Sequence, residues 1–387
     1  MRPLSAFKFF SQNKQKMLTI IMILIVAVAS VSFITSLVTT IFEDGKKTNL
    51  ATFNNFSVIT AADDELYLSN EIVDEIKEQS NVGYVVDAEV NYALYNSLLG
   101  STSVPIITIA DADELEKVFN ECDLVLDEGR FPKENSDFEI ILHSSILQNK
   151  DLSVGDYVGR DVDDNEMLAG KFKVVGSFSG NAIMGFSNNS YAMSQMANAG
   201  ITYDGPVSVL IVPKADASLA KMNDDIANYS EDNEKITITT YNTIEKMYND
   251  EMESIVFLLT IVIIVIVCAM AISTGALLYI VYMGRTEEFG ILHAIGYSKG
   301  FIKKLIFKEI TTLSSLGWLL GYVLSLCFMK LVDYLALEPN GQSFAYFTEL
   351  GIVYTLIIPV MISICAVVPI LKKLRNMDLI SVIEKRD

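Results

Sequence analysis

The stretch that decides the fold is residues 254–284, SIVFLLTIVIIVIVCAMAISTGALLYIVYMG, which holds no Asp, Glu, Lys or Arg. A helix rises about 1.5 Å per residue, so roughly 20 residues cross a hydrocarbon core of about 30 Å. This run is longer than the bilayer needs. The sequence therefore predicts a transmembrane helix, and we interpret its excess length as a stalk that supports a domain outside the membrane.

Three further uncharged runs have the same character, at residues 17–42, 310–329 and 350–371. Uncharged runs above about 18 residues are rare in the cores of soluble proteins. We therefore expect an α-helical membrane protein with four transmembrane helices, at 17–42, 254–284, 310–330 and 350–371.

The first run has a competing interpretation as a secretory signal peptide. A basic leader, residues 1–16, precedes it, and Ala27-Val28-Ala29 fits a small-x-small cleavage site. Apolar residues continue from Phe33 to Ile41, which makes the run too long for the apolar core of a signal peptide. We expect a retained helix.

Charge is segregated along the chain. The net charge is −19 although 51% of the residues are hydrophobic. Between Glu43 and Glu253 there are 14 basic and 39 acidic residues, a net of −25, whereas the remainder carries +6. The apolar content excludes a disordered acidic chain, and the lack of a basic face makes nucleic acid an unlikely partner.

Basic residues next to the helix ends predict the orientation. They cluster in the leader 1–16, in the segment 285–309 and in the tail 372–387. By the positive-inside rule these three segments, and both termini, are cytoplasmic. The acidic segment 43–253 and the short link 331–349 then lie outside.

The segment 43–253 has the pattern of an α+β domain inserted between the first and second helices. Alternation predicts strands, and apolar spacing predicts helices. The strands are expected at Gly83–Leu94, Val104–Ala110, Phe172–Phe178, Val207–Val212 and Lys235–Tyr241, and the helices at Asn70–Gln79, Asp113–Glu121 and Ala215–Tyr229. We interpret 180–205 as a long loop or a weakly structured excursion, and 161–166 as a solvated hairpin tip. Cys122 is the only external cysteine, so no intramolecular disulfide is expected there.

Motifs for catalysis and metal binding are weak. Gly296-Tyr297-Ser298-Lys299-Gly300 matches a nucleophile elbow as a string, but it follows a membrane helix rather than a strand, so a glycine turn is the better interpretation. Asp161 to Glu166 begins like a calcium loop and lacks the glycine and the final glutamate that such a loop needs. No zinc site of the usual kind can be built, and no G-x-x-x-x-G-K-[ST] motif occurs. We expect no enzyme activity and no bound cofactor on this chain.

The cytoplasmic segment 285–309 is the most informative. A charged turn leads into the apolar residues Phe289, Leu292 and Ile295, and a second amphipathic stretch follows at 301–308. A short helix between two membrane crossings can transmit a push from a soluble partner, and it can equally be an interfacial anchor. On the third helix, the small residues Gly317, Gly321 and Ser325 recur every fourth position, which suits close packing either within this chain or against a second subunit.

These motifs together resemble a known family. Arg285-x-x-Glu288-Phe289-Gly290-Ile291-Leu292-x-Ala294-Ile295-Gly296, followed by Glu309, resembles the signature of FtsX-like and MacB-type ABC-transporter permeases. The external segments 128–132, 139–142, 154–156 and 172–176 are similar to the extracytoplasmic domain of that family, and residues 377–383 to its usual ending.

The resemblance implies a permease subunit of a bacterial plasma-membrane ABC transporter. It would dimerise with an identical or different subunit, bind a cytoplasmic ATPase that holds the ATP and Mg, and couple ATP hydrolysis to movement of the external domain (mechanotransmission). The residues that the resemblance assigns to ATPase coupling are Glu287, Glu288, Phe289, Gly290, Leu292, His293, Ala294, Gly296 and Glu309. The family usually has a basic residue where His293 stands.

Two functions remain open from the sequence. The first is export or expulsion of a peptide, a lipid or a lipoprotein. The second is regulation, in which the same motion controls an external enzyme such as a cell-wall hydrolase. The size of the external domain favours transport. Its net charge of −25 would attract a cationic cargo, but a solvated acidic surface is the better interpretation of that charge, because salt screens it.

Overall fold

The computed structural model describes residues 14–62, 67–97, 100–134, 138–200, 205–232 and 235–376. The chain divides into a helical unit, Met1–Thr40, Ser254–Asp333 and Phe344–Asp387, and a sheet unit, Ile41–Glu253 and Tyr334–Ser343. Most of the predicted leader, and residues 377–383 of the family resemblance, lie outside the described residues.

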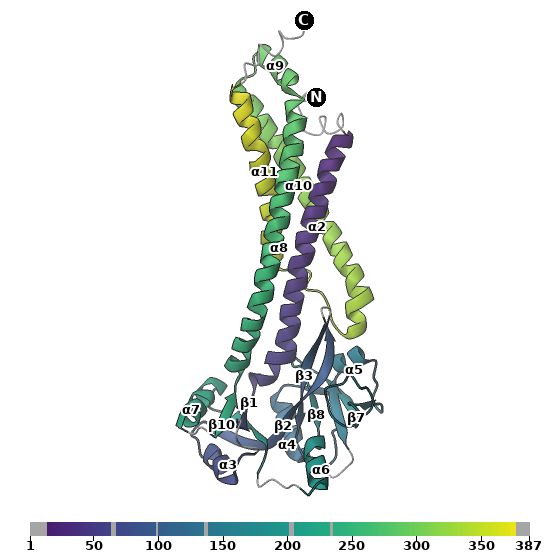
Figure 1. Ribbon diagram of the computed structural model, residues 1–387, viewed down its shortest axis with the longest axis vertical. Coiled ribbons are helices and arrows are strands. Elements are labelled where there is room, and N and C mark those ends of the chain that lie inside the picture. The colour runs from purple at the N-terminus through teal and green to yellow at the C-terminus, as the bar shows by residue number, and fades with distance from the viewer. Residues whose placement is uncertain are drawn as a thin grey trace. The chain divides into compact units, whose positions relative to one another are not determined.

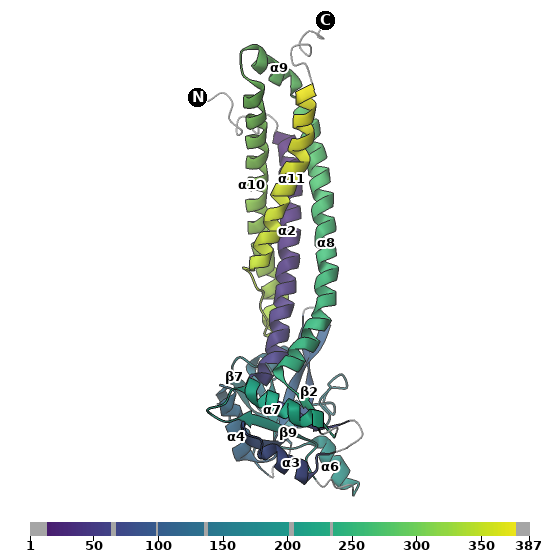
Figure 2. The same ribbon diagram turned by 90° about the vertical axis from the view of Figure 1, so that its left-hand side faces the viewer.

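The helical unit consists of long helices that run side by side (Figures 1 and 2). In the part of the chain that the structure describes, four helices are long and apolar enough to cross a membrane. They belong to α2 (Lys14–Gly45), α8 (Tyr241–Met283), α10 (Lys299–Val332) and α11 (Glu349–Asn376), and the short helix α9 (Thr286–Ala294) lies between α8 and α10 in the sequence. The amphipathic stretch predicted at 301–308 is the first part of α10, which is one continuous helix.

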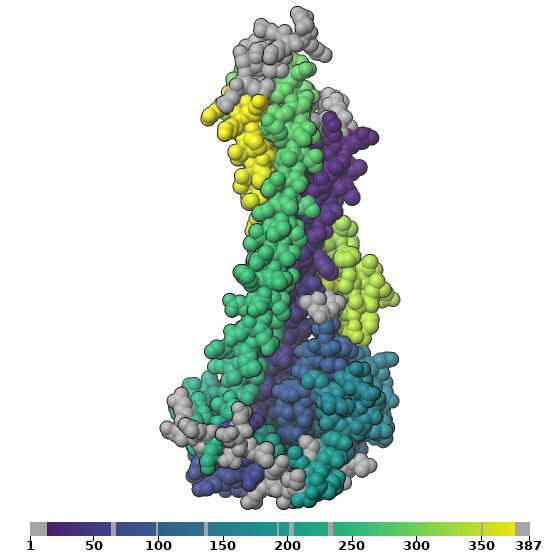
Figure 3. All heavy atoms as spheres, in the orientation of Figure 1, coloured from purple at the N-terminus to yellow at the C-terminus, as the bar shows by residue number. Residues whose placement is uncertain are grey.

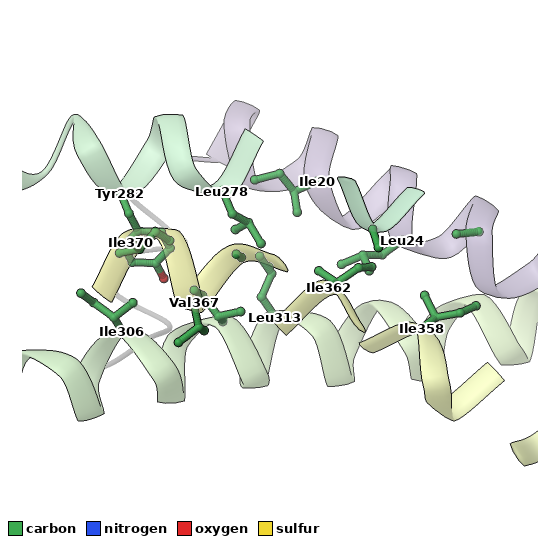
Figure 4. Close-up of a cluster of buried hydrophobic side chains, with 14 of the residues drawn as sticks. Ile20, Leu24, Leu278, Tyr282, Ile306, Leu313, Ile358, Ile362, Val367 and Ile370 are labelled. Atoms are coloured by element: carbon green, nitrogen blue, oxygen red, sulfur yellow. The ribbon is translucent and has the colours of Figure 1, made fainter. Parts of the chain in front are cut away.

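Apolar side chains from all four long helices form the core of the helical unit. Figure 4 shows Leu24 of α2, Leu278 of α8, Leu313 of α10 and Ile362 of α11 gathered in one cluster. Each of these four is at most 1% exposed. The same helices also expose large apolar side chains on their outer faces, as at Leu258 and Ile272 of α8, which are 61% and 67% exposed. Figure 3 shows α8, in green, uncovered along one face. Outer faces of this kind match a hydrocarbon surrounding.

The sheet unit is built on one mixed sheet. Among the described residues it has ten strands, in the order β10-β1-β9-β2-β3-β8-β5-β7-β4, with β6 paired to β7. Neighbours are antiparallel except for β3 with β8 and β5 with β7, which are parallel. The strands are β1 (Ser57–Ala61), β2 (Val82–Ser97), β3 (Gly100–Thr108), β4 (Val125–Gly129), β5 (Glu139–His143), β6 (Tyr157–Val158), β7 (Phe172–Ser179), β8 (Gly185–Ser187), β9 (Ser208–Pro213) and β10 (Ile236–Thr239).

Short helices cover the sheet and start at side-chain caps. They are α3 (Asn70–Lys77), α4 (Ala112–Glu121), α5 (Ser144–Lys150), α6 (Tyr191–Asn198) and α7 (Leu219–Asp232). Asp111 caps α4 by accepting from the backbone N–H groups of Asp113 and Glu114 at 2.9 and 3.0 Å, which satisfies two donors that the helix leaves free. Val118 and Phe119 of α4 then pack on the sheet with Phe178 and Phe186.

The predicted fold class, four apolar helices and a domain with a large mixed sheet, is confirmed in outline. Each of the five predicted strands and three predicted helices of the domain overlaps an observed element of the same type. One expectation was wrong: the segment 180–205 contains β8 and α6 rather than only a loop. The hairpin tip expected at 161–166 is confirmed, because this segment joins the antiparallel strands β6 and β7 and residues 161–165 are exposed. Glu166 is the exception, because its side chain is 3% exposed, accepts from Leu94 N at 2.6 Å and forms an ion pair with Lys150.

The link between α10 and α11 belongs to the sheet unit for residues Tyr334–Ser343. The buried side-chain amide of Asn149, at the end of α5, forms a hydrogen bond with this link. The Asn149 Nδ2 donates to Asn340 O at 3.0 Å and to Asn96 O at 2.8 Å, while its Oδ1 accepts from Asn96 N at 2.8 Å. Gln342 Nε2 donates to the same Asn96 carbonyl at 3.2 Å. One side chain therefore fastens both the end of β2 and the link.

Candidate functional site

The site begins where α8 ends. Gly284 and Arg285 form a turn that interrupts the helix, and Thr286 Oγ1 donates to Met283 O at 2.9 Å across it. The helix α9 then begins with Glu287 and Glu288 in its first turn, where carboxylates are favourable because the N-terminus of a helix carries partial positive charge.

Arg285 joins three helices. Its Nη1 is 2.7 Å from Glu309 Oε2 on α10, and its Nε is 3.0 Å from Glu288 Oε2 on α9. Tyr282 Oη on α8 donates to the same Glu309 oxygen at 3.0 Å. The guanidinium also lies over the rings of Tyr282 and Phe289, 5.4 and 5.1 Å from their centroids. We call Tyr282, Arg285, Glu288 and Glu309 the arginine cluster.

Burial makes the arginine cluster a fixed joint. The Glu309 side chain is 3% exposed and that of Arg285 is 12% exposed, whereas the Glu288 side chain is 61% exposed. Removing one member of a buried ion pair leaves the other charge without compensation, which costs about 3–5 kcal/mol. A motion that separates the end of α8, the start of α9 and the Glu309 region of α10 would break these ion pairs. We therefore expect the three segments to move together.

The helix α9 has one buried side and one exposed side. Phe289 is fully buried and Leu292 packs against the core of the helical unit. Ile291 and Ile295, in contrast, are 53% and 67% exposed. The exposed side also contains Glu287, Glu288, Ala294 and Gly296, four of the residues that the resemblance assigns to ATPase coupling. An acidic and apolar strip of this kind is available to a soluble partner.

The turn after α9 requires its glycine. Gly296 has φ +102°, in the region that residues with a Cβ rarely adopt, and the Tyr297 N–H donates to Leu292 O at 3.0 Å. His293 Nδ1 lies 3.0 Å from Tyr297 O, so that this ring nitrogen carries the proton and donates to the carbonyl. His293 is half-buried in the turn.

Ser298 is a helix cap. Its Oγ accepts from Phe301 N at 3.2 Å at the start of α10. The turn interpretation of the string Gly296 to Gly300 fits this geometry. Among the described residues there is also no group of three or more His, Cys, Asp or Glu side chains that could hold a metal ion.

The small residues of α10 face α2 of the same chain. A Cβ added at Gly317 would lie 2.7 Å from Leu24 Cβ, and one at Gly321 would lie 2.8 Å from Val28 Cβ and 2.9 Å from Ile25 O. Ser325 is buried further along the same helix. Of the two packing partners that the sequence left open, these contacts belong to packing within the chain.

The structure gathers Glu288, Phe289 and Glu309 around Arg285, and it leaves Glu287, Ala294 and Gly296 on the surface. Arg285 is part of the sequence motif but had no expected role, and Tyr282 lies outside that motif. A signal for the ion pair existed, because Arg285 directly follows one uncharged run and Glu309 directly precedes the next. Opposite charges at adjoining ends of two membrane helices favour a pair.

Comparisons with known proteins agree with the resemblance. Residues 252–379 match the model of the FtsX-like permease C-terminal family, a range that includes α9 and the whole arginine cluster. No curated protein matches the chain. Among solved structures, the chain is similar to the periplasmic region of MacB from Actinobacillus actinomycetemcomitans, at 14% identity and a TM-score of 0.32 over 51% of this chain and 95% of that one. It is also similar to the extracellular domain of the noncanonic ABC-type transporter YknZ from Gram-positive bacteria, at 14% identity and a TM-score of 0.29 over 48% of this chain and 99% of that one.

Proposed function

We propose that this chain, whose residues 252–379 match the FtsX-like permease C-terminal family, is the membrane subunit of an ABC-type permease. In this proposal a separate cytoplasmic ATPase, which holds ATP and Mg, docks on α9. The permease couples ATP hydrolysis to motion of the sheet unit outside the membrane, and it works as a dimer with a second permease subunit. The cargo is a peptide, a lipid or a lipoprotein.

The arginine cluster is the observation that supports this proposal best. A partner that pushes on α9 acts on Arg285, which is bonded to Glu309 of α10 and stacked on Tyr282 of α8. The push is therefore shared between two long helices rather than absorbed by a loose loop. The exposed side of α9, with Ile291 and Ile295, offers the contact surface.

The charge distribution supports the orientation. Lys299, Lys303, Lys304 and Lys308 occupy the first part of α10, beside α9, and Lys372 and Lys373 occupy the last part of α11. The positive-inside rule places these ends in the cytoplasm, where an ATPase is found. The sheet unit, with its acidic composition, is then extracytoplasmic and inserted between the first and second membrane helices.

ATPase stimulation tests the coupling. The purified chain in lipid nanodiscs is added to its ATPase, and the hydrolysis rate is compared for wild type, Ala294→Asp and Gly296→Pro. Ala294 is exposed, so a carboxylate there changes the docking surface and leaves the helical unit folded. Proline cannot adopt the φ of +102° at Gly296, so this variant displaces the turn.

Both variants are expected to lose stimulation while the thermal unfolding of the sheet unit is unchanged. Gly300→Ala is the matched control, because a Cβ at Gly300 meets open space apart from Ser298 Oγ at 3.8 Å. Full stimulation by both variants would overturn α9 as the docking site.

A further inference from the structure

We propose that the sheet unit binds a basic peptide segment in the cavity between α6 and the face of strands β2 and β3. The cavity has a volume of about 860 Å³, in the range of about 300–1,000 Å³ that is typical of ligand sites. The role of the peptide as cargo rests on the proposed function. Binding of the peptide, in contrast, can be measured on this chain alone.

The floor of the cavity is acidic. Asp87 and Glu89 are two residues apart on β2, so their side chains project from the same face of the sheet. Glu89 pairs in register with Thr108 of β3, which lines the same cavity. No Lys or Arg is among the described residues that line it.

One carboxylate oxygen of Glu89 lacks a hydrogen-bond donor in the described part of the chain. Its Oε2 atom is buried and makes no hydrogen bond to any described residue. A carboxylate oxygen that is withdrawn from water without a partner is costly, and a cationic donor removes that cost. Among the described residues no group of three or more His, Cys, Asp or Glu side chains could hold a metal ion, so the complementary occupant that we consider is an organic cation.

The opposite wall is apolar and adaptable. Met193 and Met196 of α6 line the cavity together with Phe138. Methionine side chains are flexible and polarisable, so they accommodate apolar groups of different shape. Lysine and arginine side chains combine a cationic head with an apolar stem. The head would face the carboxylates, and the stem and any apolar residues next to it in the peptide would face the methionines. Backbone amides of the peptide would face the polar rim at Ser190 and Ser194.

A direct binding measurement tests the proposal with the full-length chain in nanodiscs and without any ATPase. The probes are two fluorophore-labelled synthetic peptides, Leu-Lys-Leu-Lys and its neutral counterpart Leu-Gln-Leu-Gln. Wild type is expected to bind the lysine peptide at least tenfold more tightly than the glutamine peptide. Equal affinity for the two, or no binding of the lysine peptide at millimolar concentration, would overturn the proposal.

Variants locate the binding. Glu89→Gln is expected to weaken the lysine peptide at least tenfold, and Asp87→Asn to weaken it less, because Glu89 has the buried unpaired oxygen. Ala197→Trp, which fills the cavity from α6, is expected to abolish binding. Glu116→Gln, at an exposed carboxylate on α4, is the control and should bind like wild type. Thermal unfolding of each variant confirms that it is folded.

A diazirine-bearing leucine in the lysine peptide provides a second readout. Cross-links are expected on α6 or on β2, as mapped by mass spectrometry. Cross-links confined to other parts of the sheet unit would show that the site is wrong even if the peptide binds. If peptide binding fails while Ala294→Asp still abolishes ATPase stimulation, only the binding site is refuted. If peptide binding holds while α9 variants stimulate normally, the proposed coupling is refuted instead.

Discussion

Arg285 and Glu309 are 24 positions apart in the sequence and meet at 2.7 Å, one at the end of an uncharged run and the other at the start of the next. Their contact closes the turn that contains α9. It also explains why two charged side chains remain buried at this end of the helical unit, since each compensates the other and Tyr282 supplies a further hydrogen bond.

Glu309→Gln is expected to destabilise the helical unit by about 3–5 kcal/mol, because Arg285 keeps its charge and loses its buried partner. The measurement is thermal or denaturant unfolding of the purified chain in detergent. Glu288→Gln is the matched control, since it removes the other ion pair of the same arginine at a carboxylate that is 61% exposed. Its cost should stay below about 1 kcal/mol. Equal costs for the two variants would contradict the buried role of Glu309.

Gly321→Ala is expected to destabilise the packing of α10 on α2 more than Gly317→Ala does. At Gly321 the added Cβ would meet Val28 Cβ at 2.8 Å and two backbone atoms of Ile25, its oxygen at 2.9 Å and its Cα at 3.1 Å. At Gly317 it would meet Leu24 Cβ at 2.7 Å, and its other close contacts are the outer Leu24 side-chain atoms Cδ1 and Cγ, so relief at Gly321 requires more backbone movement. Gly300→Ala, in open space, should be neutral or slightly stabilising. If instead Gly321→Ala left unfolding unchanged and dissociated a dimer, the small residues would pack between subunits.

Asn149→Ala removes a buried amide that makes three hydrogen bonds, two of them to Asn96 and one to Asn340. A cost of about 1.5–4.5 kcal/mol is expected for the three bonds, at about 0.5–1.5 kcal/mol per hydrogen bond. Hydrogen exchange should accelerate in Tyr334–Ser343 and around Asn96. Gln148→Ala is the control, because the exposed Gln148 side chain makes a single bond to Glu338 O, and it should leave exchange near Asn96 unchanged.

His143 makes the stability of the sheet unit depend on pH. Burial lowers the pKa of His143 below its usual 6.5 in the folded protein, in which Nδ1 accepts from Ser145 N at 3.1 Å and Nε2 donates to Gly180 O at 3.2 Å. The unfolded chain therefore binds a proton more readily, and stability is lost as the pH falls below about 6.5. His143→Asn keeps an acceptor for the start of α5, and it should flatten the unfolding temperature between pH 7.5 and 5.5 relative to wild type. An unchanged slope would contradict this assignment.

Cys122 should resist thiol reagents until the sheet unit unfolds. Burial raises the pKa of its thiol to about 12, so the thiolate fraction is about a thousandfold lower than for an ordinary cysteine with a pKa of 9.0. In a background with Cys268, Cys327 and Cys365 replaced by serine, maleimide labelling at pH 8 should require denaturant. Glu116→Cys in the same background, at an exposed position, should label at the normal rate. Rapid labelling of Cys122 in the folded protein would contradict the burial.

Local patterns predicted much of this fold. The apolar residues Ile72, Val73 and Ile76 indicated α3, and alternation at 236–240 indicated β10, because both signals lie within a few neighbouring residues. The strand β8 has only three residues, and it exists because β3 and β5 pair with it from distant parts of the chain. No short-range pattern could reveal it, although Ser190 is a recognisable cap for α6.

The candidate site was only partly predictable from the sequence, because some of its contacts join residues that are far apart in the chain. The resemblance pointed to Glu288 and Glu309, but the role of Arg285 follows only from the packing of α8 on the start of α10, which brings Tyr282 and Glu309 together. The cavity at Glu89 depends on the register of β2 with β3 and on the packing of α6 beside them, and both relationships are long-range. The sequence showed that the domain has an excess of acidic residues. It did not show which carboxylate lacks a hydrogen-bond partner.

The fastening of the link by Asn149 changes what the sheet unit can do as a mechanical body. The chain enters it after α2, leaves it into α8, and returns through Tyr334–Ser343 between α10 and α11. The link is therefore not a free loop between two helices, because a displacement of Asn340 loads the Asn149 amide and, through it, Asn96 at the end of β2.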